Sequence, residues 1–364
     1  MSIDALMATL DGASAARIQT ALLQPADTFV ALAGEEFRTR LFTTEDASGK
    51  PLCLRPDFTI PVCLEHLKSG AQTPTVYSYR GPIFRKHRTT GEPEFEQAGA
   101  EWLGHADEVA TDAMVFATAA ECARVVGLTP KIRIGDANVF AALSQALGLS
   151  KSWQSRLSAT FGDRRRLDGS LKRLSGETSD NAATDRLASA LAHLGPTEAR
   201  AIIDAVLAGH SRGPVAGRTA DDIAERILDL AAINGGNPAA VSVINDYLTL
   251  SGPLASAADT LTAFAARHDL ALGPAIARFS ARTEALAAAG LDPAHITFEA
   301  AFGRRLGYYT GLVFEFANAE PSHVEVIAGG RYNALATMLR PGVTLPGIGF
   351  SVWLDRLPPS GAPS

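Results

Sequence analysis

The chain has 364 residues, of which 46% are hydrophobic and 20% charged, as expected for a globular protein with one large domain or a domain with an insertion. Its net charge of −6, from 33 basic and 39 acidic residues, argues against a protein that binds nucleic acid over its whole surface. The cysteines form no CxxC pair, the histidines show no metal-ligand spacing, and the sequence shows neither a signal segment nor an apolar run of membrane-spanning length. We therefore expect a cytoplasmic protein without a membrane span, a structural metal or a cofactor.

The first part of the chain is predicted to start as helix and continue as strands. Residues 1 to about 45 carry apolar residues in a loosely helical rhythm that Pro25 interrupts, namely Leu6, Leu10, Ile18, Leu22 and Leu23. From Pro51 to Gly104, short β-type runs alternate with turn residues, and the polar loop TTGEP joins two of them into a predicted antiparallel hairpin. A helix within 106–128, with acidic residues in its first turn and Gly127 just past its end, then leads to a strand at 131–136.

The region 137–292 is rich in Ala, Leu and Arg and is predicted to be a mainly helical insertion. One of its helices, over 273–290, has Gly290 as its expected C-cap. Its most basic run, RRRLDGSLKRL at 164–174, is interpreted as a solvated helix face, with nucleic-acid contact as the alternative.

Strand-like patterning returns after residue 293, and 358–364 is expected to be a disordered tail. We predict an α+β fold in which 1–136 and 293–357 form one core around the helical insertion. Because the strands show no regular βαβ alternation, the sheet should be antiparallel and flanked by helices. The sequence contains no GxGxxG motif, which argues further against a Rossmann fold.

Polar residues inside the strand-like runs are the first candidate site. Arg55, Asp57 and Thr59 follow one another at period two, which would place them on one face of an extended segment. Gln97 and Glu101 are four apart, an even offset that again selects one face. With Arg85, this set of acids, an amide and a cation would suit a zwitterion. The alternative is a row of cross-strand salt bridges on a solvated sheet face.

Two further clusters follow in the C-terminal part. In FGRRLGYYTGLVFEF, the tyrosines Tyr308 and Tyr309 beside Arg304 could form the wall of a small flat ligand, or could simply pack in the core. In IAGGRYNAL and LPGIGFSVWLDRL, glycines allow close backbone approach, and Arg356 could meet a phosphate. No local context such as GxSxG suggests nucleophilic catalysis, so we assign no catalytic residue.

In their order and in their amino-acid sequences, these segments resemble the histidyl-tRNA synthetases, a class II aminoacyl-tRNA synthetase family, from about residue 20 to 357. LRPDFT is similar to the family's LRPEGT strand, YRGPIFRKHR followed by FEQAGAE resembles motif 2, and RRLGYYTGLVFEF resembles the histidine-specific segment. AGGRYNAL with GIGFSVWLDRL resembles the motif 3 region, whose arginine would be Arg356. The resemblance implies a class II fold and a histidine pocket formed by eight residues: Asp57, Thr59, Arg85, Gln97, Glu101, Arg304, Tyr308 and Tyr309.

The departures from the synthetase pattern indicate a different activity. The chain ends within eight residues of Arg356, where a synthetase continues into an anticodon-binding domain, so we expect no such domain and no tRNA partner. In the motif 2 loop, His87 replaces a glutamate, and Pro93 and Glu94 stand where basic residues would hold ATP. Glu94 would repel a triphosphate. Gly307 replaces the aspartate of the synthetase pattern RGLDYY.

A retained amino-acid pocket without the anticodon domain resembles the paralogous family of ATP phosphoribosyltransferase regulatory subunits. The resemblance implies a homodimer within a hetero-oligomer with the short-form catalytic subunit, required for its activity and for feedback inhibition by L-histidine. One alternative is a synthetase-derived ligase that adenylates histidine or another amino acid without reading tRNA. A second is an amino-acid-binding homodimer without the phosphoribosyltransferase partner.

Overall fold

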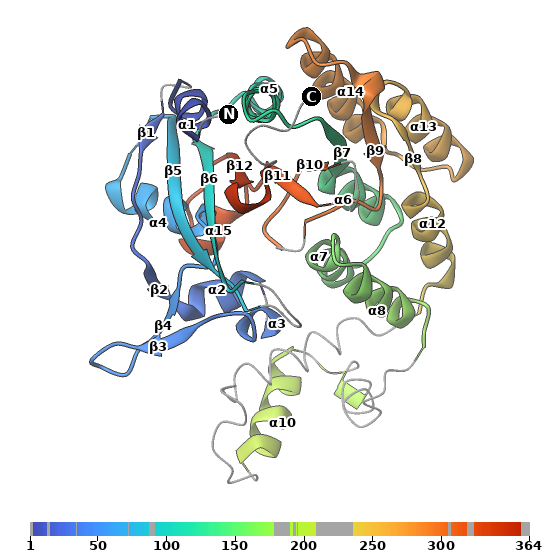
Figure 1. The fold of residues 1–364 in the computed structure, drawn as a ribbon. Helices are drawn as coiled ribbons and strands as arrows, with labels where there is room; N and C mark the ends of the chain where they lie inside the picture. The colour runs from blue at the N-terminus through green and yellow to red at the C-terminus, as the bar shows by residue number, and fades with distance from the viewer. Residues whose placement is uncertain are drawn as a thin grey trace.

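The computed structural model describes residues 3–12, 15–33, 35–71, 73–86, 92–177, 190–191, 194, 196–208, 236–304, 307–318 and 324–357. Its centre is a nine-stranded sheet with helices packed around it (Figure 1). In spatial order the strands are β1 (Ala16–Arg17), β5 (Thr75–Phe84), β6 (Glu94–Leu103), β12 (Gly347–Trp353), β11 (Glu325–Arg331), β10 (Leu312–Asn318), β7 (Pro130–Asp136), β9 (Ile296–Glu299) and β8 (Ser251–Pro253). Among the strand pairs that the structure describes, β1–β5 and β7–β9 are parallel and the others antiparallel. The predicted α+β fold with a largely antiparallel sheet is confirmed.

One face of the sheet is apolar because alternate residues of each strand point to it. Ala98, Ala100 and Trp102 of β6 are buried on this face beside Phe350 of β12 and Phe314 of β10. The helices of this layer include α1 (Ile3–Gly12), α5 (Glu108–Val125), α13 (Leu254–Arg267) and α14 (Gly273–Ala288). This layer is the larger of the two hydrophobic clusters and holds the sheet in place.

The opposite face carries polar residues and glycines where β5, β6 and β12 meet. A second apolar cluster flanks it, built around Phe29, Phe58 and Leu335. The elements on this side are β2 (Leu23–Pro25), α2 (Ala26–Ala33), α3 (Glu35–Arg38), β3 (Thr43–Glu45), β4 (Pro51–Leu54), α4 (Thr59–Ser69) and α15 (Leu335–Leu339). Strands β2, β4 and β3 form a small separate sheet. The polar face is therefore walled in on one side, which makes it suitable for a ligand pocket.

Helices follow β7 in the region expected to be an insertion. They are α6 (Ala137–Ala146), α7 (Lys151–Thr160), α8 (Arg164–Leu174), α10 (Pro196–Ala208) and α12 (Pro238–Leu248). Asp136 and Asp163 cap α6 and α8 by accepting hydrogen bonds from backbone N–H groups of the first turn. The chain then returns to the sheet as β8, α13, α14, the short 3₁₀ helix η2 (Pro293–His295) and β9. The backbone N–H of Asn237 donates to the carbonyl of Leu174 at 2.6 Å, so α8 and α12 meet at their ends.

A buried ion network joins the apolar layer to the sheet. Asp112 of α5 lies between two arginines and accepts from Arg282 Nε of α14 and from Arg331 Nε of β11, each at 2.7 Å. Arg282 also pairs with Asp136 at the end of β7. All four side chains are at most 3% exposed. Two positive and two negative charges balance, as a buried network requires.

Two predictions about the N-terminal part were wrong. Residues 1 to 45 are not one helical region, because α1 ends at Gly12 and short strands follow before α2. Leu22 and Leu23 are 47% and 48% exposed, so they do not belong to a buried helix face. The segment from Arg55 to Thr59 is not a continuous strand, because β4 ends at Leu54 and Thr59 is the first residue of α4.

Several predicted features agree with the structure. The antiparallel hairpin is formed by β5 and β6, and the helix and strand that follow are α5 and β7. Gly127 and Gly290 lie just past the ends of α5 and α14 with φ of 67° and 86°. The expected tail at 358–364 lies outside the described residues, as does His87 of the hairpin loop. Among the helices that the structure describes, none is long and apolar enough to cross a membrane.

Candidate functional site

Glu101 lies at the centre of the polar face, on β6, and is 1% exposed. Its carboxylate accepts hydrogen bonds from Thr59 Oγ1 at 2.7 Å and from the Tyr79 hydroxyl at 3.3 Å, and a third from the Tyr332 hydroxyl. Burial raises the pKa of Glu101 to about 7, against the three hydrogen bonds, which favour the ionised form. The carboxyl is therefore positioned rigidly and ionises near neutral pH.

Two glycines create the space for this arrangement. A Cβ at Gly349 of β12 would lie 1.7 Å from Glu101 Oε2. A Cβ at Gly99 of β6 would lie 2.5 Å from the Tyr79 hydroxyl. Because no side chain fits at either position, the neighbouring strand leaves the polar face open for Glu101 and Tyr79.

Asp57 and Gln97 bring further acceptors to the same region. Asp57 follows β4, and its Oδ1 accepts from the backbone N–H of Ile60 at 3.2 Å. Asp57 Oδ2 and Gln97 Oε1 are buried, and neither has a hydrogen-bond partner in the described part of the chain. Burial raises the pKa of Asp57, and the nearby Arg85 opposes this. Buried acceptors without donors are rare in folded proteins, so both atoms are suited to receive a ligand's N–H groups.

Three tyrosines from the C-terminal part of the chain lie near Glu101. The ring centroids of Tyr308 and Tyr309 are 4.8 Å apart, and that of Tyr332 is 6.0 Å from the first and 6.4 Å from the second. Tyr308 and Tyr332 are at most 2% exposed. Three rings with mutually inclined planes next to a carboxylate can enclose a small planar group that donates a hydrogen bond.

Arginines occupy the other end of the site. Arg304 pairs with Glu325 of β11 at 2.6 Å, and Arg356 donates to the backbone carbonyl of Glu325 at 2.8 Å. The guanidinium carbons of Arg85 and Arg356 lie 5.2 and 4.0 Å from the ring centroid of Trp353. These cations are held by stacking and hydrogen bonds at the edge of an open cavity.

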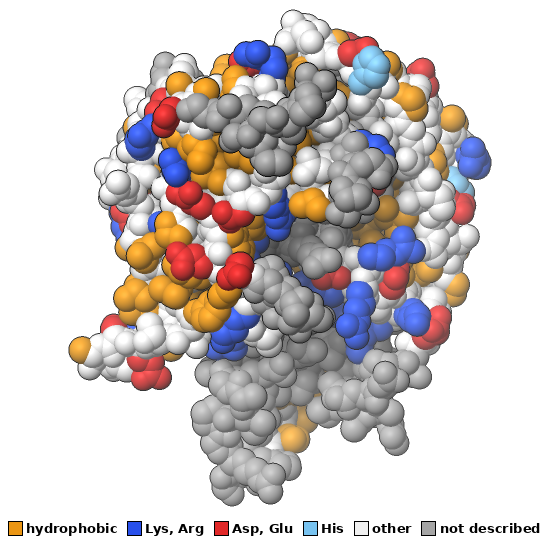
Figure 2. All heavy atoms as spheres, in the orientation of Figure 1, with side chains coloured by type: hydrophobic (Ala, Val, Ile, Leu, Met, Phe, Trp, Pro, Cys, Tyr) orange, Lys and Arg blue, Asp and Glu red, His pale blue; other side chains and the backbone are white. Residues whose placement is uncertain are grey.

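The cavity next to these arginines has a volume of about 730 Å³. Among its lining residues are six arginines and three glutamates: Arg40, Arg85, Arg133, Arg164, Arg304, Arg356, Glu299, Glu315 and Glu325. Figure 2 shows basic side chains around the hollow in the middle of this face. Since positive charge is in excess, the cavity favours anionic groups.

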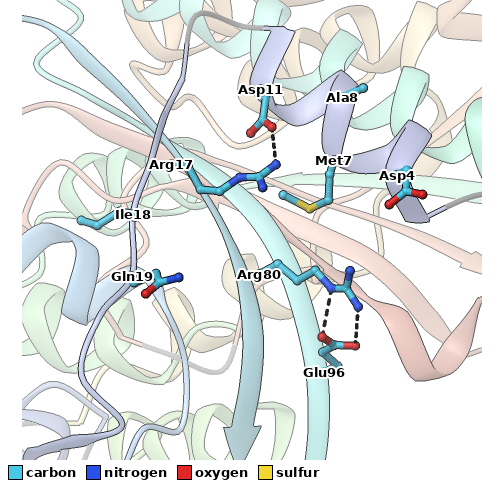
Figure 3. Close-up of a pocket in the computed structure, with 9 residues that line it drawn as sticks. All are labelled: Asp4, Met7, Ala8, Asp11, Arg17, Ile18, Gln19, Arg80 and Glu96. Carbon is cyan, nitrogen blue, oxygen red and sulfur yellow. Dashed lines mark hydrogen bonds and ion pairs between the residues drawn. The ribbon is translucent and has the colours of Figure 1, made fainter.

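A second cavity, of about 510 Å³, lies between α1 and the β1 edge of the sheet. Four of its five charged side chains pair with one another: Arg17 with Asp11, and Arg80 Nε with Glu96 Oε1 at 2.9 Å (Figure 3). These pairs are partly exposed, as ordinary surface ion pairs are. We assign no ligand to this cavity.

The structure joins some predicted site residues directly and separates others. Thr59 contacts Glu101, whereas Arg55 points away and donates to Thr20 and to the Pro82 carbonyl. Arg331, the arginine of the IAGGRYNAL segment, belongs to the buried ion network and not to the site. Tyr79 was missed, although the alternation YSYR on a predicted strand could have placed it on the Glu101 face. The described residues contain no group of three or more side chains arranged to bind a metal ion.

The chain is similar to a known family along nearly its whole length. A family model described as histidyl-tRNA synthetase matches residues 5–226 and 218–357. A protein of Brucella anthropi named ATP phosphoribosyltransferase regulatory subunit is 42% identical over 361 residues, which covers 97% of this chain and 95% of the relative. The protein of the same name from Brucella canis is 41% identical over 360 residues, with the same coverage.

Solved structures show the same fold at lower identity. A structure from Bacillus halodurans, described as an ATP phosphoribosyltransferase regulatory subunit/histidyl-tRNA synthetase, is 22% identical with a TM-score of 0.65 and covers 97% of this chain and 76% of that one. The histidyl-tRNA synthetase of Nostoc sp. is 16% identical with a TM-score of 0.61 and covers 98% and 69%. The class II synthetase-like architecture predicted from the sequence is thereby confirmed.

Proposed function

Because the chain belongs to the histidyl-tRNA synthetase family and, within it, to the ATP phosphoribosyltransferase regulatory subunits, we propose that it senses L-histidine in the pocket around Glu101. The regulatory subunit itself is non-catalytic and serves the first step of histidine biosynthesis. We further propose that a homodimer of this chain assembles with the short-form catalytic subunit. Histidine bound in the pocket then regulates the activity of that subunit.

The observation that carries the proposal is a set of buried hydrogen-bond acceptors near Glu101 that lack donors in the described part of the chain. Asp57 Oδ2 and Gln97 Oε1 lack donors among the described residues, and a ligand's ammonium group would supply them. Glu101 would accept the imidazole N–H, with Thr59 fixing the carboxylate through its hydrogen bond to Oε1. The three tyrosines would enclose the ring.

The α-carboxylate of the ligand requires a cation at the other end of the pocket. Arg85 and Arg304 lie there, and a guanidinium binds a carboxylate through two parallel hydrogen bonds. Arg304 is paired with Glu325 in this structure. We therefore assign the ligand's carboxylate to both arginines together. When histidine binds, its carboxylate replaces Glu325 as the partner of Arg304.

Regulation needs more than binding. Histidine changes the activity of a complex only if it binds one arrangement of the complex more tightly than another, and by linkage the catalytic partner then changes the affinity for histidine by the same factor. The expected sign for feedback inhibition is that histidine favours the less active arrangement.

The first experiment is to assay the short-form ATP phosphoribosyltransferase of the same organism with and without this chain and then to titrate histidine. Activity that depends on this chain and falls with histidine supports the proposal. If the enzyme shows no dependence, ATP–pyrophosphate exchange tests the ligase alternative. Failure of the two proteins to co-purify would instead favour an amino-acid-binding homodimer.

Histidine binding has its own test in isothermal calorimetry. Glu101→Ala should abolish the histidine-induced heat, because it removes the carboxylate that Thr59 and Tyr332 hold in position to accept the imidazole N–H. Glu121→Ala is a matched control, since Glu121 pairs with Arg124 on the surface of α5. An unchanged signal in Glu101→Ala would remove Glu101 from the pocket.

A further inference from the structure

Glu325 lines the arginine-rich cavity and makes several hydrogen bonds there. Its Oε2 is 2.6 Å from Arg304 Nη1, and its Oε1 accepts from Arg304 Nη2 at 3.4 Å and from Trp353 Nε1 at 3.1 Å. Its backbone carbonyl accepts from Arg356 at 2.8 Å. One residue therefore engages two arginines and the ring on which Arg356 stacks.

The Glu325 carboxylate is an anion already in place. Burial alone would raise the pKa of Glu325. The Arg304 guanidinium outweighs this effect and holds that pKa below its ordinary value, so the carboxylate is charged at neutral pH. It faces Arg304 through both of its oxygens, the arrangement in which a guanidinium also binds a phosphate. A phosphate entering the cavity would have to displace Glu325 from Arg304 and remain beside its negative charge.

We propose that Glu325 determines which anions the cavity admits, and that its carboxylate excludes polyphosphates from Arg304 and Arg356. This goes beyond histidine sensing, because it concerns a different class of ligand in the cavity that shares Arg85 and Arg304 with the histidine pocket. Six arginines against three glutamates would otherwise make the cavity attractive to a group with several negative charges. A built-in carboxylate lowers that attraction where the arginines converge.

The test is calorimetric binding of inorganic tripolyphosphate to the full chain as wild type, Glu325→Gln and Glu299→Gln. Glu299 is the matched control: it lines the same cavity and loses the same charge, but its partner Arg133 keeps a second carboxylate, Glu315, at 2.6 Å. We expect Glu325→Gln to bind tripolyphosphate at least about tenfold more tightly than wild type, because one charge is removed within a few ångströms of the bound anion. Glu299→Gln should gain much less.

Equal binding by wild type and Glu325→Gln, or an equal gain in Glu299→Gln, would overturn the proposal. Adding Arg304→Gln to Glu325→Gln should cancel the gain, and a gain that persists would also count against it. Should Glu325→Gln fail to fold, wild type still decides: micromolar binding of tripolyphosphate overturns the proposal, and its absence supports it. Histidine titrations of the same samples separate this result from the success or failure of histidine sensing.

Discussion

Replacing Glu101 with glutamine should stabilise the folded chain at alkaline pH while weakening its affinity for histidine. Glu101 is 1% exposed, and its pKa is raised from 4.5 to about 7. A carboxyl whose pKa is higher in the folded than in the unfolded chain binds its proton more tightly when folded. Its contribution to stability is therefore complete below about pH 4.5 and is lost as the pH rises through about 7.

The magnitude follows from the two pKa values. A shift from 4.5 to about 7 corresponds to about 3 kcal/mol, of which about 2–3 kcal/mol is lost between about pH 5 and pH 8. Glutamine does not titrate and avoids this loss. Rearranging Thr59 and Tyr332 around an amide has a cost of its own, but that cost does not depend on pH over this range. The gain of the variant over wild type should therefore be about 2–3 kcal/mol larger at pH 8 than at pH 5.

Urea unfolding of both proteins, followed by tryptophan fluorescence across this pH range, measures the difference. Histidine affinity at pH 8 should fall by about 10- to 150-fold, the value of a hydrogen bond to a charged acceptor. A stability difference that is the same at every pH would refute the assignment of Glu101 as a buried carboxyl that ionises near neutrality.

Three other substitutions test the scaffold and the pocket. Asp112→Ala leaves Arg282 and Arg331 without their shared partner and should lower the free energy of unfolding by about 3–5 kcal/mol; a urea midpoint close to that of wild type would contradict this. Gly349→Ala places a methyl 1.7 Å from Glu101 Oε2 and should weaken calorimetric histidine binding at least about tenfold, by about the value of one hydrogen bond to a charged group. Gly169→Ala on α8 meets open space and should instead stabilise the chain by up to about 1 kcal/mol without changing histidine binding; an equal loss of binding in both glycine variants would count against the pocket.

The part of the fold that the sequence predicted best is the part governed by local alternation. The even offset between Gln97 and Glu101 placed both on one face of β6, and β6 runs without a bulge against β5 and β12. The same reasoning failed at Thr59, because the chain turns from β4 into α4 between Leu54 and that residue. Pro61, in the first turn of α4, was an available signal for a helix start there.

The partners of buried charges could not be predicted, because they come from distant parts of the chain. Arg331 lies one residue before Tyr332, yet the two side chains serve different layers: one binds Asp112 in the apolar layer and the other donates to Glu101. Glu325 was named by no motif, and its role depends on Arg304 and Arg356 meeting it in space. Composition and spacing indicate which residues are polar, whereas only the fold indicates which of them already have hydrogen-bond or ion-pair partners within the protein.

The contact between Asn237 and Leu174 has a consequence for how this protein can change in length. Since α8 ends and α12 begins at one point, whatever chain lies between them closes a loop whose ends are already joined by a 2.6 Å hydrogen bond. Doubling such a loop costs only about 0.6 kcal/mol in closure entropy. In closure entropy alone, changes in the length of this stretch therefore cost little, whereas its described helix α10 is tied to the rest of the molecule because Ala199 and Ile203 are buried in the larger hydrophobic cluster. An engineer who attaches a reporter domain at this junction would therefore keep α10 and change only the length of chain around it.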